Sequence, residues 1–184
     1  MSTSTPSATT SSLRERQAPL KARYQEDPGS ARTTITVRSV TDEALATADP
    51  PRVRIAADAA PDQSWEVGAH PMAGGEEGRI CSGDLLLGSL AACQELTIRM
   101  VAAAMGITLD TLELTVEGDM DFRGTMGLDP DTPVGFDAIR VHARIEADAP
   151  ADRLERLVQR AERYCVVNAT LGRPPRVELT IGTG

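Results

Sequence analysis

Aromatic residues are scarce in this 184-residue chain, at 3% of the sequence. They are Tyr24, Trp65, Phe122, Phe136 and Tyr164. A chain of this length is expected to form one domain and is large enough to bury a substantial core. Because so few rings are present, that core must be built from the aliphatic side chains of Leu, Val, Ile, Ala and Met.

The sequence also lacks an excess of basic residues, since 19 Lys and Arg stand against 27 Asp and Glu, a net charge of -8. Phosphate backbones are bound by clustered lysine and arginine, so this balance argues against a nucleic-acid partner. There is no secretory hydrophobic region and no long uninterrupted apolar run. The sequence therefore predicts a soluble, cytoplasmic protein without a membrane partner.

Three cysteines, Cys81, Cys93 and Cys165, do not make a disulfide framework in a chain this long. In a reducing compartment, scattered cysteines are packing residues or reactive thiols. The aspartates between residues 119 and 131 lack the residue order of a calcium-binding EF-hand loop. We therefore expect no metal and no cofactor.

Residues 1–12 are Ser, Thr, Pro and Ala apart from the initial Met, with no large apolar group to offset the entropy of ordering. We predict a disordered Ser/Thr-rich tail over residues 1–18 and a single domain over residues 19–184. Arg14 and Arg16 follow this segment, as in a transit peptide, but no amphipathic apolar face accompanies them.

The stretch from Cys81 to Gly106, CSGDLLLGSLAACQELTIRMVAAAMG, predicts a central helix. Capping residues begin it, and Gly106 adopts a positive φ without strain just past its end. Its first half is apolar on all sides and must be covered on every side. It is too short, and after Cys93 too polar, to span a membrane. Because one further predicted helix could not cover it, we expect an obligate homodimer.

Alternation with period two predicts strands on both sides of this helix. The predicted strands are 33–37, 53–55 and 64–67 before the helix, and 112–116, 136–147 and 177–181 after it. A second helix begins near Pro150, and its apolar stripe carries Leu154, Leu157, Val158, Ala161 and Cys165. The order βββ-α-ββ-α-β indicates an α+β domain.

A cysteine inside an apolar helix is usually a small hydrophobic residue, and burial alone makes its thiol inert. Cys93 lies about three turns from the start of its helix, where the helix dipole no longer acts. Arg99 is turned to another face, so a reactive Cys93 needs a cation from another segment. A reactive role is favoured by the two cysteines taken together, because Cys93 and Cys165 both occupy core-facing helix positions. Their thiols meet if the two helices pack together.

Two segments, SGDLLLGSLAACQELTIR and AERYCVVNATL, together resemble the OsmC/Ohr family of osmotically inducible and organic-hydroperoxide-resistance proteins. The segments CSGDLL and GDMDFRG…PVGF are similar to the OsmC-like branch of that family. The resemblance covers roughly residues 20–182. It implies an intertwined homodimer in which two central helices are backed by curved antiparallel sheets, with active sites at the subunit interface.

The resemblance also implies a thiol-dependent peroxidase for organic hydroperoxides. Cys93 would attack the hydroperoxide, Cys165 would resolve the sulfenic acid as a disulfide, and an external dithiol would reduce it. In the peroxidase branches a glutamate ten residues before the attacking cysteine polarises the thiol together with an arginine. Gly83 occupies that position here, and Asp84 is the nearest acid. The arginine stays open among Arg32, Arg38, Arg52 and Arg54.

Asp84 can replace the missing glutamate only from a cap or first-turn position. Nine helical residues separate it from Cys93, a rotation of about 180° that points a residue of the helix body away from the thiol. Cys81 precedes the helix, where the dipole lowers a thiol pKa, but it has no counterpart in the two-thiol chemistry, and semi-buried packing is its commoner role.

The competing hypothesis is a non-catalytic protein of the same fold that binds a small hydrophobic ligand between the helices. A carboxylate and an arginine near Cys93 favour the peroxidase. An apolar shell without a cation favours the binding protein.

Overall fold

The computed structural model describes residues 12–40 and 52–182, and the chain divides into two compact units at Thr34 and Ile35. The described part of the first unit holds helix α1 (Leu13–Glu26) and the 3-10 helix η1 (Pro28–Ala31). Ser12 and Glu15 form a capping box, in which each side chain accepts the backbone N–H of the other, at 3.3 and 2.7 Å.

This capping box explains why the predicted disordered tail is wrong for residues 13–18, which begin α1. No residue of α1 is buried, so the helix relies on its caps and local hydrogen bonds. Residues 1–11 of the predicted tail lie outside the described residues.

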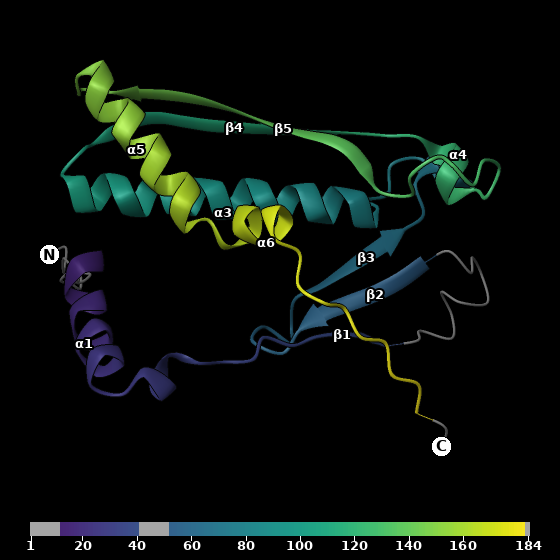
Figure 1. The fold of residues 1–184 in the computed structure, drawn as a ribbon, viewed down its shortest axis with the longest axis horizontal. Coiled ribbons are helices and arrows are strands. Elements are labelled where there is room, and N and C mark those ends of the chain that lie inside the picture. The colour runs from purple at the N-terminus through teal and green to yellow at the C-terminus, as the bar shows by residue number, and fades with distance from the viewer. Residues whose placement is uncertain (1–11, 41–51, 183–184) are drawn as a thin grey trace, which may run out of the picture. The chain divides into compact units, whose positions relative to one another are not determined.

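The second unit begins with a three-stranded antiparallel meander of β1 (Val37–Val40), β2 (Arg52–Ala57) and β3 (Ser64–Gly68), in that order (Figure 1). The second and third predicted strands are confirmed. The first is misplaced, because pairing with β2 starts only at Val37, opposite Ala57 at the end of β2. The residues before Val37 therefore have no opposing residue of β2.

Helix α3 (Ser82–Met105) confirms the predicted central helix, and Gly106 ends it in the left-handed conformation with φ 64°. The expectation that it is too short for a membrane span was wrong, because its 24 residues would suffice by length and composition. Its second half is nevertheless interrupted by the Glu95–Arg99 ion pair at 2.7 Å, which argues for a helix of a soluble protein.

Strands β4 (Leu109–Met120) and β5 (Phe136–Ala147) form a two-stranded antiparallel sheet that contacts α3 through β4. Both were predicted, β4 as a shorter strand. The connection between β4 and β5 contains the short helix α4 (Phe122–Thr125). Helix α5 (Ala151–Tyr164) packs on α3, and its Arg153 donates to the carbonyl oxygen of Met105 at 2.7 Å, which ties α5 to the end of α3.

Two predictions about the C-terminal part of the chain were wrong. Cys165 does not lie within the second helix but between α5 and a further helix, α6 (Val166–Gly172). Residues 177–181 alternate as predicted but form no strand in the described chain. Val177, Leu179 and Ile181 are 88, 91 and 80% exposed, because no neighbouring strand binds this backbone within the described residues. The α+β class is confirmed, and the element order gains α1, α4 and α6 and loses the last strand.

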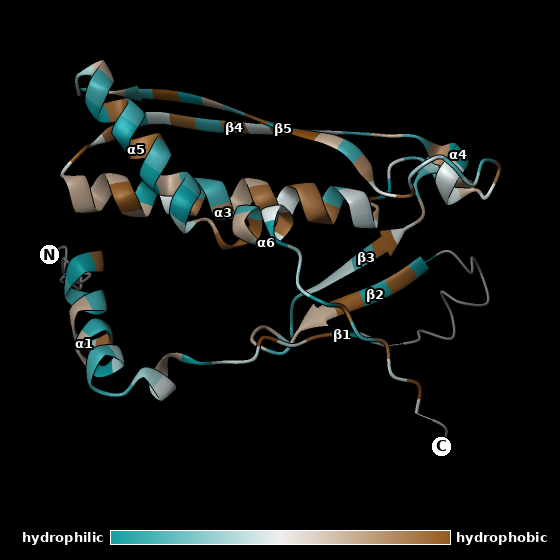
Figure 2. Cartoon of the chain, viewed as in Figure 1, coloured by the Kyte–Doolittle hydropathy of each residue, from teal (hydrophilic) through white to brown (hydrophobic). Residues whose placement is uncertain are grey.

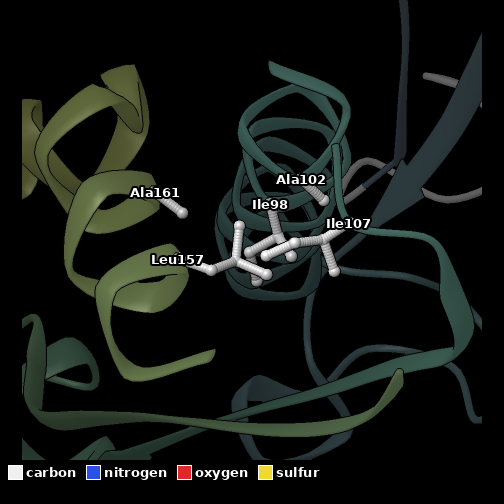
Figure 3. Close-up of a cluster of buried hydrophobic side chains, with 5 residues drawn as sticks. All are labelled: Ile98, Ala102, Ile107, Leu157 and Ala161. Carbon is white, nitrogen blue, oxygen red and sulfur yellow. The ribbon is translucent and has the colours of Figure 1, made fainter. Parts of the chain in front are cut away.

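The core is aliphatic, as the composition predicted. Ile98, Ala102, Ile107, Leu157 and Ala161 form a buried cluster in which α5 side chains point toward α3 (Figure 3). Apolar residues occur along much of α3, whereas hydrophilic residues occupy most of the length of α5 (Figure 2). On α3, Leu86, Leu96 and Met100 are 38, 61 and 42% exposed. One chain alone therefore leaves part of the apolar surface of α3 uncovered.

Candidate functional site

Helix α6 contacts both α3 and α5, and this arrangement brings Cys93 and Cys165 together. Cys93 lies in the middle of α3, and Cys165 both ends α5 and caps α6. Cys165 is fully buried and Cys93 half-buried, and both thiols are free. Each side chain acts on the pKa of the other, so the two thiols lie near each other. Cys165 takes up this position from the break between α5 and α6 and not from within a helix.

The environment of Cys93 favours its thiolate form. Burial raises the pKa of the thiol, but hydrogen bonds outweigh burial and leave the pKa below its ordinary value. The groups that lower the pKa are the backbone N–H of Val167, the Cys165 side chain, the backbone N–H of Val166 and the Thr97 hydroxyl. No charged side chain of the described residues is among them. The thiolate is therefore stabilised by neutral donors.

The environment of Cys165 favours its protonated form. Burial raises the pKa of this thiol, and the nearby Cys93 side chain raises it further. The backbone N–H of Asn168, 3.5 Å from the Cys165 sulfur, acts in the opposite direction but is outweighed. Cys93 is consequently the thiol of the pair that ionises first.

Thr97 is buried one helical turn after Cys93, and its hydroxyl donates to the carbonyl oxygen of Cys93 at 2.7 Å. The hydroxyl carries one proton, so donation to the thiolate competes with this bond. We expect Thr97→Val to raise the pKa of Cys93, because one donor to the thiolate is lost. The pH dependence of Cys93 alkylation by iodoacetamide measures this, and the alkylation profile should move to higher pH.

Thr97→Ser keeps the hydroxyl and should retain the original profile. Thr115→Val removes an exposed threonine on β4 and serves as the matched control. An unchanged profile in Thr97→Val would show that this hydroxyl does not act on the sulfur.

Asp84 lies in the first turn of α3, as predicted, but its side chain points to another group. Its Oδ2 accepts the backbone N–H of Cys81 at 2.8 Å, as the acidic half of a capping box at the helix start. It is not among the groups that set the pKa of Cys93. Cys81 caps α3, is 8% exposed and lies beside Gly83. The structure therefore places Asp84 with Cys81 and not with the thiol pair.

The three candidate arginines of the second unit form ion pairs with carboxylates on or near the first sheet. Their partners are Asp58 for Arg38, Glu76 for Arg52 and Glu66 for Arg54. None of them is among the main groups that shift the pKa of Cys93. Arg32 belongs to the first unit. The choice of arginine that the sequence left open stays open.

A model of the OsmC-like protein family matches residues 74–180, more than half of the chain and including both Cys93 and Cys165. The chain belongs to the OsmC-like protein family. This confirms the resemblance seen in the sequence.

Several solved structures share the fold of this OsmC-like protein. The OsmC-like protein of Mycoplasma pneumoniae has a TM-score of 0.61 at 19% identity, over 77% of this chain and 89% of that one. The organic hydroperoxide resistance protein OsmC of Legionella pneumophila has 0.58 at 22% identity, over 78% and 92%. The organic hydroperoxide resistance protein of Elizabethkingia anophelis has 0.55 at 18% identity, over 78% and 91%. No curated protein matches the chain significantly.

Sequence reasoning missed the neutral donors around Cys93 in this OsmC-like protein. Thr97 could have been found, because residues four apart in a helix lie on the same face. The backbone N–H groups of Val166 and Val167 gave no such signal, because their position depends on the break after Tyr164.

Proposed function

We propose that this OsmC-like protein is a cysteine-based peroxidase that reduces organic hydroperoxides in the cytoplasm. The observation that carries the proposal is the adjacent pair of thiols whose pKa values are shifted in opposite directions, down for Cys93 and up for Cys165. A thiolate is the nucleophile in such chemistry, and the second thiol nearby can resolve the product, losing its proton as water leaves. Cys93 is assigned as the peroxidatic residue and Cys165 as the resolving one.

The proposed reaction has three steps. The Cys93 thiolate attacks the terminal oxygen of the hydroperoxide, the O–O bond breaks, and the alcohol leaves after taking up a proton. Cys93 is then a sulfenic acid, which Cys165 attacks to form a disulfide with release of water. An external dithiol reduces this disulfide by thiol–disulfide exchange and restores both thiols. Asp84 is assigned no step, because its side chain is bonded to the backbone at Cys81.

The test is mass spectrometry of the free thiols after one equivalent of cumene hydroperoxide. The proposal expects a disulfide between Cys93 and Cys165 while Cys81 stays reduced. Oxidation of Cys81 with both other thiols left free would contradict it.

Cys165→Ser should expose Cys93 to over-oxidation. Without the resolving sulfur the sulfenic acid persists, and a second equivalent of hydroperoxide converts it to the sulfinic acid. Intact-mass analysis should show a gain of two oxygen atoms on Cys93 in this variant and the disulfide in the parent protein. A variant that recycles at the parent rate with the same dithiol would show that Cys165 is not the resolving residue.

We also propose a homodimer. The support is the apolar surface that one chain leaves open, namely Leu86, Leu96 and Met100 on α3 and the alternating residues Val177 and Leu179. Multi-angle light scattering at micromolar concentration should give twice the chain mass of 19.6 kDa. A stable monomer under these conditions would reject the proposal.

One observation favours the alternative, a ligand-binding protein whose cysteines only line the site. Among the described residues, the main groups that shift the pKa of Cys93 carry no charge. The mass-spectrometric test separates the two, because a binding protein would leave all three thiols reduced at one equivalent of hydroperoxide.

A further inference from the structure

A cavity of about 370 Å³ lies at the start of α3, away from the thiol pair. It is lined by Cys81 and Asp84 from the helix start, by His70 from the preceding loop, and by Phe122 and Phe136. Cys81 precedes Cys93 by twelve residues, about 18 Å along a helix at 1.5 Å per residue. Cys93 and Cys165 do not line the cavity. It is therefore a second site, independent of the proposed peroxidase chemistry.

Glycines and ring contacts shape the walls of this cavity. A Cβ atom at Gly118 would lie 2.6 Å from the Phe136 ring, and one at Gly83 would lie 3.3 Å from it. The ring of Phe136 thus lies against Gly118 and Gly83, which leave room for it because they have no side chains. His70 stacks on Phe122 with centroids 4.7 Å apart. The apolar wall is consequently formed before any ligand arrives, as in most small-molecule sites.

The polar groups of the cavity have defined hydrogen-bonding roles. His70 Nδ1 accepts the backbone N–H of Met72 at 3.1 Å, so the proton of the neutral ring is on Nε2. Asp119 also lines the cavity, but both of its oxygens bind Arg140, which balances its charge. Asp84 forms no ion pair with Lys or Arg among the described residues, and only its Oδ2 is engaged. The N-terminus of α3 carries a partial positive charge of roughly +0.5, which offsets about half of the negative charge of Asp84. A net negative charge remains beside an aromatic wall.

We propose that this cavity binds a small organic cation, an amine carried on a ring or a short apolar chain. The ammonium group would bind the free oxygen of Asp84. Its apolar part would lie against Phe136 and Leu87, and the rings of Phe122 and Phe136 favour a cation over an anion. This ligand differs from the hydrophobic molecule of the alternative function in both its charge and its place.

Three probes with the same ring test the proposal on the full-length protein. Benzylamine, benzyl alcohol and phenylacetate are titrated separately, and binding is followed by ¹H–¹⁵N NMR shifts. Benzylamine should bind most tightly and phenylacetate least, with the shifts centred on His70, Cys81, Asp84 and Gly118. Absence of saturable shifts with benzylamine, or phenylacetate binding as tightly, would overturn the proposal. This comparison needs no variant.

Asp84→Asn keeps an acceptor for the Cys81 N–H but removes the charge. It should weaken benzylamine binding about fivefold and change benzyl alcohol binding little, as for a partly exposed ion pair. Asp148→Asn, at an exposed carboxylate after β5, is the matched control and should alter neither. If Asp84→Asn weakened the binding of benzylamine and of benzyl alcohol equally, Asp84 would only shape the cavity, and the charge-based proposal would fail. Cys93→Ser should leave all three affinities unchanged.

Discussion

Replacement of Cys93 by serine is expected to abolish hydroperoxide consumption, with a loss of at least about a thousandfold in kcat/KM. A serine hydroxyl stays protonated at neutral pH and has no pathway to a sulfenic acid, so both the attack and the disulfide are lost. The measurement is consumption of cumene hydroperoxide with dithiothreitol as reductant.

Cys81→Ser is the matched control for this experiment. It changes a buried cysteine at the start of the same helix and should leave the rate nearly unchanged, because Cys81 lies outside the thiol pair. A Cys93→Ser protein that consumes hydroperoxide at the parent rate would end the peroxidase assignment. Loss of activity in both variants would instead indicate damage to α3, which circular dichroism would detect.

Replacement of Leu157 by alanine is expected to lower the free energy of unfolding by about 2–5 kcal/mol. Leu157 is fully buried and joins α5 to Ile98, Ala102 and Ile107 in the core cluster (Figure 3). Its truncation removes buried apolar area and leaves a cavity between α5 and α3. Such a loss is large against a total stability of about 5–15 kcal/mol for a domain.

Urea unfolding at one fixed protein concentration measures this effect, because association of subunits would couple to unfolding. Leu128→Ala is the matched control, since Leu128 is 75% exposed in the excursion between β4 and β5. It should change the stability by less than about 0.5 kcal/mol. Equal effects in the two variants would show that the α3–α5 contact does not stabilise the fold. Because α5 also leads to Cys165, Leu157→Ala should in addition slow disulfide formation.

Local signals predicted the central helix and four of the strands. The capping residues before Leu85 and the glycine at 106 defined both ends of α3, because helix termini depend on a few neighbouring residues. Alternation predicted β2, β3, β4 and β5, where each strand has a partner within the same chain.

The same alternation was misleading at residues 33–37 and 177–181. Alternation of apolar and polar residues indicates that the side chains suit an extended chain. A strand also needs a neighbouring backbone with which to exchange hydrogen bonds. Val37 is the first residue of its strand because the opposing strand ends at Ala57. Val177 and Leu179 have no such neighbour in the described chain and stay exposed.

The sequence by itself determined the fold class, the central helix, and two cysteines that lie within the segment matching the OsmC-like family. Only the tertiary structure decided which of those thiols ionises first. The pKa of a thiol depends on the donors within a few ångströms of its sulfur, and for Cys93 these include backbone N–H groups at the α5–α6 break. The same holds for Asp84, whose position in the helix was predictable while its partner, the Cys81 N–H, was not. Spacing along a helix selects a face, whereas the groups that reach that face come from distant parts of the chain.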